Sequence, residues 1–158
     1  MLDKKHSLAT CEKLQKDRVE QWINNGPDPE SILEVEIFGK YIARDLKRVK
    51  VPYKKRPIDE SVSTSQIRQV FTKLKTIEAK GGIGTPTEKT QFLMLKPLVA
   101  YASGKHDKTG LKQLKKRLDW AIDEVMKADN EDEQQTRFKH FCRLFEAILA
   151  YHRAYGGK

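Results

Sequence analysis

The chain has 158 residues, 38% of them apolar and 34% charged, and its 31 Lys and Arg side chains against 22 Asp and Glu give a net charge of +9. This size suits one domain with a real hydrophobic core. The sequence contains no run of eighteen apolar residues, the length that a membrane-spanning helix needs. The first residues also lack the apolar segment of a signal peptide. We therefore expect a cytoplasmic protein that is neither secreted nor membrane-spanning and that has no membrane partner.

Two cysteines far apart in the sequence, Cys11 and Cys142, agree with that location. Secreted chains usually carry an even set of disulfide-forming cysteines, whereas two separate thiols fit a reducing compartment. Cys142 falls within an apolar helical pattern, so we expect a small core residue there, and a disulfide between the two is not favoured.

The positive charge is concentrated in one part of the chain. Residues 61–117 carry 12 basic side chains against three acidic ones, whereas residues 1–60 have a net charge of +2 and residues 118–158 a net charge of −2. A field concentrated in this way attracts a polyanion such as a nucleic acid or an anionic membrane. The alternative is a lysine-rich surface that only keeps the protein in solution.

Apolar residues recur every three or four positions along nearly the entire chain, which predicts helices throughout. A first helix is predicted over about residues 8–24, because the Gly26-Pro27 pair that follows cannot continue it. The second begins near Pro29, with Asp28 as its N-cap, and continues along an apolar stripe to just before Pro52. Residues 52–57 contain two prolines and are predicted to form a linker.

The third helix begins after Ser63-Thr64-Ser65, any of which can cap it, and stops at Lys80-Gly81-Gly82. A fourth is predicted from a Thr87 cap to Ser103-Gly104, with a kink or break at Pro97. Thr109 is the predicted cap of the fifth, and the last helix covers about residues 132–155.

Five to six helices with short connections predict an all-α fold, a compact helical bundle. We expect a single helical domain over residues 1–158, with its core at about residues 30–156 and with residues 1–26 as an N-terminal helix or extension.

The sequence offers no catalytic or metal site. None of the four histidines forms an H-x-x-x-H or H-E-x-x-H motif, and the glycine loop at residues 81–84 is too short for a phosphate-binding loop and lacks its lysine. Glu146 lies amid apolar residues, where an ion pair with Arg143 explains it better than a general base does. We therefore predict that the protein is not an enzyme and has no catalytic residue, cofactor or metal.

Basic residues instead form clusters that are predicted to bind nucleic acid. One surrounds Tyr53 at residues 47–56, where an aromatic ring amid cations could stack on an unpaired base, and a solvated linker is an equal alternative. Others lie on the third helix, along the fifth helix up to Arg117, and on the last helix. The predicted nucleic-acid-binding residues are Arg68, Lys75, Lys96, Lys105, Lys108, Lys112, Lys115, Lys116, Arg137, Lys139 and Arg143.

No base-reading motif accompanies these cations, so binding is expected to follow the nucleic-acid backbone with little sequence preference. A role at a membrane surface is disfavoured, because no helix pairs a basic face with exposed Trp or Phe.

Three motifs occur in a fixed order along the chain. Residues 63–71 read Ser-Thr-Ser-Gln-Ile-Arg-Gln-Val-Phe, residues 95–102 read Leu-Lys-Pro-Leu-Val-Ala-Tyr-Ala, and residues 141–152 read Phe-Cys-Arg-Leu-Phe-Glu-Ala-Ile-Leu-Ala-Tyr-His. Together they resemble the small helical subunit of type III-A CRISPR effector complexes, the Csm complexes, over about residues 30–156. Pro97 and the first 25 or so residues depart from the resemblance.

The resemblance implies a non-catalytic subunit that contacts the guide–target duplex through phosphates. The implied partners are crRNA and target RNA, or single-stranded DNA, together with the backbone subunit, the large polymerase-like subunit and further copies of this chain. The motif positions that the resemblance carries over as functional are Gln66, Arg68, Lys96, Arg143 and Glu146. Of these, Arg68 and Lys96 are expected to contact phosphate.

Two other functions are compatible with the sequence. A protein-interaction adaptor would use the basic face to dock acidic partner subunits. A small helical hydrolase would need a buried carboxylate–histidine pair that the spacing does not reveal.

Overall fold

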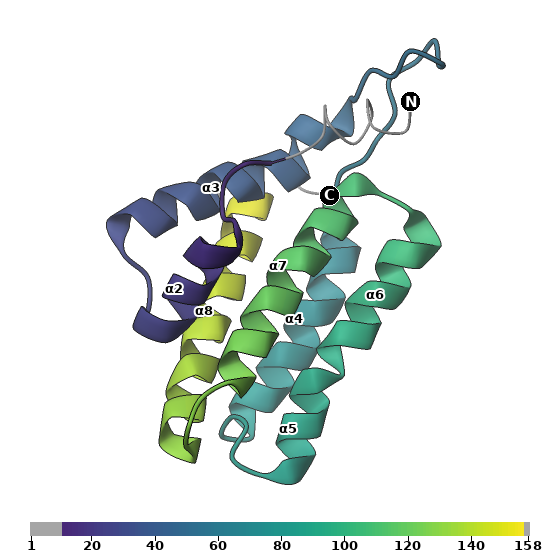
Figure 1. Ribbon diagram of the computed structural model, residues 1–158. Coiled ribbons are helices and arrows are strands. Elements are labelled where there is room, and N and C mark those ends of the chain that lie inside the picture. Colours follow the sequence, from purple (N-terminus) through teal and green to yellow (C-terminus); the bar gives the residue numbers. More distant parts are fainter. Residues whose placement is uncertain (1–10, 157–158) are drawn as a thin grey trace.

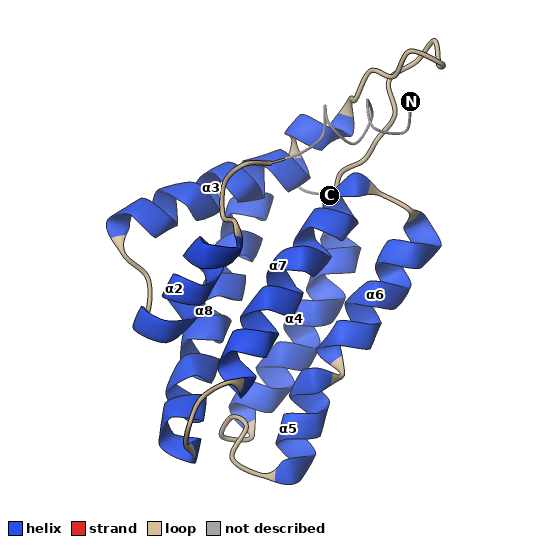
Figure 2. Cartoon of the chain, in the orientation of Figure 1, coloured by secondary structure: helices blue, strands red, loops and turns tan. Residues whose placement is uncertain are grey.

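The computed structural model describes residues 11–156, and within them it has seven α-helices, one short 3-10 helix and an isolated β-bridge between Val49 and Ile58. The all-α prediction is confirmed (Figure 2). In chain order the elements are α2 (Lys16–Asn25), α3 (Pro29–Ala43), η1 (Asp45–Lys47), α4 (Thr64–Ala79), α5 (Pro86–Leu93), α6 (Leu95–His106), α7 (Thr109–Met126) and α8 (Glu131–Ala154).

Helix α8 is the longest element, and α2, α3, α4 and α7 all pack against it. Helices α4, α6, α7 and α8 run alongside one another, and α3 crosses one end of α8 (Figure 1). The core is rich in aromatic rings: Phe92 of α5 meets Phe138 and Phe141 of α8 edge-on, with centroids 5.3 and 4.9 Å apart. Such edge-to-face pairs add to the stabilisation from burial.

The crossing of α3 over α8 requires a glycine. A Cβ atom at Gly39 would lie only 2.6 Å from Cβ of Tyr151, so any larger residue would force the two backbones apart. On the same side, the Trp22 indole is buried and donates a hydrogen bond of 3.0 Å to the carbonyl of His140. Helices α2 and α3 are thus fitted closely onto α8 and contribute to one hydrophobic cluster with it.

The N-terminal helix begins later than predicted. Residues 8–10 lie outside the described residues, and residues 11–15 are not helical, because Leu14 adopts a left-handed backbone (φ 57°). The backbone N–H of Leu14 donates a hydrogen bond of 2.8 Å to the Glu34 carboxylate of α3. This N–H is therefore satisfied without a helical partner.

The second helix ends earlier than predicted, at Ala43 rather than just before Pro52. Residues 58–62 return along the chain, and their backbone N–H groups donate to the carbonyls of Val49, Leu46 and Ile42. This long-range pairing replaces the last turns of the helix that the apolar stripe predicts. The Asp28 cap at its other end is confirmed, since its side chain accepts from Ser31 N–H at 2.8 Å.

The predicted fourth helix is two helices, as Pro97 suggested. The break falls at Met94, which places Pro97 in the first turn of α6, where no intrahelical donor is needed. The predicted Thr87 cap is wrong: the side chain of Thr85 accepts from Glu88 N–H, and Pro86 occupies the first helical position.

Two further boundaries also differ from prediction. Helix α6 continues past Ser103-Gly104 to His106, and Asp107 ends it in a left-handed conformation (φ 48°). Thr109 does not cap α7, because its backbone N–H and hydroxyl both donate to the buried Glu60 carboxylate, at 2.9 and 2.7 Å. The end of α6 is thus set locally by Asp107, whereas the start of α7 involves Glu60, a group distant in the sequence.

We expect Ser63→Ala to lower the free energy of unfolding by about 1 kcal/mol, because Ser63 caps α4. Its hydroxyl accepts from Gln66 N–H, and its own N–H donates 2.8 Å to the Gln66 side chain. Urea denaturation would measure the change, with the exposed Ser65→Ala as the control. A loss no larger than that of the control would contradict the cap.

We expect His152 to make the fold sensitive to acid. Burial lowers the pKa of His152, its hydrogen bond to the Val62 carbonyl opposes this, and the charges of Arg153 and Lys47 lower the pKa further. The folded-state pKa of His152 lies below the unfolded value of about 6.5. The stabilisation that neutral His152 contributes is therefore fully present above that pH and is lost as the pH falls through the folded-state pKa. The added proton would sit on a buried Nδ1 that has no partner among the described residues.

The measurement is the free energy of unfolding between about pH 7 and pH 5, compared with His152→Gln, which keeps a donor but does not titrate. Wild type should lose more stability than the variant over this range. Parallel curves for the two proteins would exclude His152 as the source.

Candidate nucleic-acid interface

An open groove runs between α4 and α6. Two adjoining hollows of about 400 and 500 Å³ form it and share Ser65, Gln69 and Leu98 as lining residues. Arg68 and Lys73 line it on the α4 side. Tyr101, Lys105, His106 and Lys108 line the end where α6 leads into α7.

The groove combines free cations with an exposed aromatic ring. Tyr101 is 68% exposed, and the Lys105 ammonium lies 5.8 Å from the centre of its ring. Within residues 11–156, no ion pair joins Arg68, Lys105 or Lys108 to a carboxylate. Unpaired cations beside an exposed ring can hold phosphates while a base stacks on the ring.

Where α4 faces α8, the cations are matched by acids. Lys75 donates 2.8 Å to Glu146 of α8 and 3.0 Å to Glu78, and Arg143 reaches Glu146 at 3.3 Å. The hydrogen bonds to Glu146 and Glu78 raise the pKa of Lys75. Partial burial opposes ionisation of Glu146, but Lys75 and Arg143 together lower its pKa. The predicted Arg143–Glu146 pair is confirmed, and Lys75 extends it to α4.

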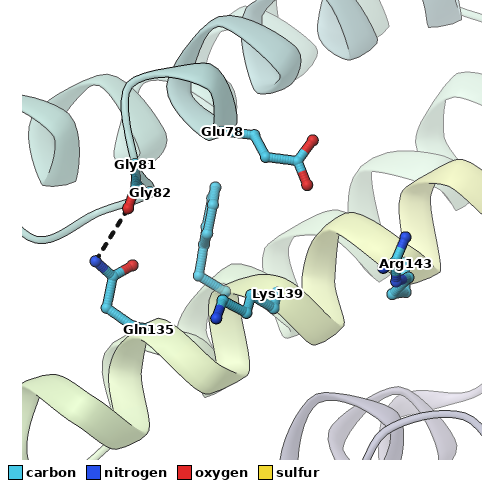
Figure 3. Close-up of a pocket in the computed structure, with 7 residues that line it drawn as sticks. Glu78, Gly81, Gly82, Gln135, Lys139 and Arg143 are labelled. Atoms are coloured by element: carbon cyan, nitrogen blue, oxygen red, sulfur yellow. Dashed lines mark hydrogen bonds between the residues drawn. The ribbon is translucent and has the colours of Figure 1, made fainter.

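A hollow of about 410 Å³ lies beside this network, between the end of α4 and α8 (Figure 3). Glu78, Lys139 and Arg143 line it. Gln135 also lines it, but its amide is already occupied, because it accepts from Ile83 N–H and donates to the Gly81 carbonyl. The charges of this hollow are of both signs, so it attracts an anion less than the α4–α6 groove does.

Two of the four lysines of the predicted fifth-helix stripe, Lys112 and Lys115, are also neutralised. Lys112 binds Asp107, and Lys115 donates 2.7 Å to Asp119. The two acids that flank the stripe therefore reach back onto it. The Lys115–Asp119 pair has the i,i+4 spacing of neighbours on a helix, whereas Asp107 lies outside α7. Lys116 is exposed and has no ion pair within the described part of the chain.

Two other predicted residues form contacts between neighbouring helices. Lys96 of α6 donates 2.6 Å to Asp123 of α7. Arg137 of α8 is half-buried, donates 2.7 Å to Glu133 and donates 2.7 Å to the Glu124 carbonyl. Both residues fasten helices together.

The family model for Csm2 Type III-A matches residues 52–158, which include α4 to α8. The chain belongs to this family. Csm2 is the small subunit of the type III-A CRISPR Csm complex, a structural subunit generally considered non-catalytic. The match begins later than the resemblance over residues 30–156, so α2 and α3 lie outside it. The comparisons with curated proteins and with solved structures found no match.

Motif residues of this Csm2 chain differ in what they contact. Gln66 completes the capping box of α4, so it shapes the helix start. Arg68 is exposed on the groove, whereas Lys96 is held by Asp123. Tyr101, within the second motif, was not singled out from the sequence, although its spacing of four residues from Lys105 was a usable signal for a ring and a cation on one helix face.

Arg117 does not belong to the surface of this Csm2 protein. It is 1% exposed, its guanidinium donates 2.9 Å to the Lys13 carbonyl and 3.2 Å to that of Cys11, and it lies 4.4 Å from the ring centre of Phe38. Burial lowers its pKa. Arg117 therefore fixes the N-terminal segment to α7 and is not available to RNA, although the sequence pattern assigns it to the basic cluster of the fifth helix.

Nothing among residues 11–156 forms a group of three His, Cys, Asp or Glu side chains that could hold a metal. Both cysteines are buried free thiols, as predicted for Cys142, and burial raises the pKa of Cys142 to about 12. No helix in the described part of the chain is long and apolar enough to span a membrane.

We expect Arg117→Ala to lower the free energy of unfolding by about 3 kcal/mol, because it removes the hydrogen bonds to the Cys11 and Lys13 carbonyls and opens a cavity beside Phe38. The neighbouring Lys116→Ala, at an exposed position, should change it by no more than about 0.5 kcal/mol. Chemical denaturation measures both. Equal losses in the two variants would show that the buried contacts of Arg117 do not stabilise the fold.

Proposed function

We propose that this Csm2-family chain binds RNA along the α4–α6 groove, through phosphates and without sequence preference, as a non-catalytic subunit in the cytoplasm. The observation that carries this proposal is the set of cations in the groove that no acid of residues 11–156 neutralises, beside an exposed Tyr101. Phosphate contacts give affinity that does not depend on sequence.

The electrostatics of the surface rank the predicted contacts. Arg68, Lys105 and Lys108 meet RNA directly in the groove. A cation already bound to a carboxylate must exchange that partner for a phosphate, so it adds less to binding. This second group contains Lys75, Lys96, Lys112, Lys115, Arg137 and Arg143, while the exposed Lys116 and Lys139 lie outside the groove and extend the positive field.

Within the Csm complex, we propose that the ligands are crRNA and target RNA, or single-stranded DNA, and that the protein partners are the backbone subunit, the large polymerase-like subunit and further copies of this chain. Family membership supports assembly with other Csm subunits and RNA. The groove supports a surface contact to a strand rather than enclosure of a small substrate, because both of its hollows are open to solvent.

A double variant, Arg68→Gln with Lys105→Gln, should weaken binding to a fluorescent single-stranded RNA of about 40 nucleotides, a length that accommodates several copies. The log–log slope of affinity against salt should fall by about 1.4, since each lost phosphate contact removes about 0.7. Fluorescence anisotropy at several salt concentrations measures this change.

The matched control is Lys13→Gln with Lys16→Gln, which removes the same charge from exposed positions in the N-terminal segment and α2. If both double variants bind RNA like wild type, the groove is not the RNA surface. An RNA-independent loss of co-purifying Csm subunits in the groove variant would indicate an adaptor that docks acidic proteins.

A further inference from the structure

Residues 48–58, here the cationic arm, project from the end of the bundle between η1 and α4 (Figure 1). The arm is closed at its base by the bridge between Val49 and Ile58, whose two backbone N–H groups each donate 2.9 Å to the other residue's carbonyl. Val49 and Val51 are buried in the core cluster. Both ends of the arm are therefore anchored at its base, and the residues between them are largely exposed.

The tip is a tight turn that presents one aromatic ring. Lys54 N–H donates 3.3 Å to the Val51 carbonyl, which places Pro52 and Tyr53 at the two central positions of the turn. Proline at the first of these fixes its backbone and lowers the entropy of the free turn. Tyr53 is 66% exposed, so its ring is held out in solvent by a constrained backbone.

The arm carries only positive charge. Five cations and no acid occur in it, namely Arg48, Lys50, Lys54, Lys55 and Arg56. All five are exposed, and no ion pair joins any of them to a carboxylate of the described chain. Many lysines of the bundle, by contrast, are bound by acids, so the arm is an unneutralised positive element.

The base of the arm lies next to one end of the α4–α6 groove. The buried Glu60, two residues after the arm, accepts from Thr109, and its backbone carbonyl accepts 2.8 Å from Gly110 N–H. Lys108, the residue before Thr109, lines that end of the groove, and so does Ser63. Lys108 and the base of the arm are therefore neighbours at this end of the groove.

We propose that the cationic arm is a second binding element for single-stranded RNA, in which Tyr53 stacks on an unpaired base and the neighbouring cations hold the adjacent phosphates. The proposal rests on RNA binding by the groove. An unpaired base is required, because only its face is open to stacking. An acidic protein fits the arm less well, since a protein interface needs an apolar centre and the exposed tip offers a single ring.

The test compares two single-stranded RNAs on the full chain, one of about 6 nucleotides to fit the groove and one of about 15 to reach past it. Tyr53→Ala should lower affinity for the longer RNA about 5-fold or more, with an unchanged salt slope, since a stacked base contributes without a charge. Tyr53→Phe keeps the ring and should bind like wild type. Lys54→Gln with Lys55→Gln should lower the slope by about 1.4.

The shorter RNA separates the two proposals. None of the arm variants should change its affinity, whereas Arg68→Gln with Lys105→Gln should weaken both RNAs. If the arm variants bind the longer RNA like wild type while the groove variant fails, the arm proposal is overturned and the groove stands. If wild type binds neither RNA, both are overturned. Equal losses in Tyr53→Phe and Tyr53→Ala would exclude stacking, and Lys13→Gln with Lys16→Gln again controls for net charge.

Discussion

The bundle depends on α8 burying side chains toward several neighbours at once. Helices α2, α3, α4 and α7 all contact it, and its buried residues recur every three or four positions, so they form one broad apolar face. A face of this length and width needs several partners, because one neighbouring helix cannot cover it. Gly39 allows α3 to approach closely enough to do so, and Phe92 of α5 fills the space against Phe138 and Phe141.

Carboxylates within the chain decide which of its many cations remain available. Lys75, Lys96, Lys112 and Lys115 hold helices or turns together through acids close in space. Exposed ion pairs of this kind stabilise little, but they reduce the field that a distant polyanion meets. Among the cations left over, one group lines the α4–α6 groove and another occupies the arm, whereas others, such as Lys116 and Lys139, lie elsewhere on the surface.

Helix identity and order could be predicted from the sequence, because local periodicity and caps such as Asp28 and Ser63 carry that information. The shift of the α5 cap from Thr87 to Thr85 is local, but several other errors originate in long-range contacts. Glu60 occupies the hydroxyl of Thr109, Glu34 captures the backbone of Leu14, and the returning segment ends α3 early. The burial of Arg117 is similar, since its partners, the carbonyls of residues 11 and 13, are more than a hundred positions away. Charge spacing along a helix cannot report such partners.

The match to the Csm2 family model begins at residue 52, but the structure has no domain boundary at that position. That position falls inside the turn at the tip of the arm and separates Val49 from Ile58, its partner in the bridge. Residues 11–51 also supply Trp22 and Phe38, which are buried against α8 and α7. We infer that the family-wide portion is not an autonomous folding unit in this protein. The helices of residues 11–51 cover part of α7 and α8. Substitutions in this segment, which lies outside the family match, should therefore alter the stability of residues 52–156.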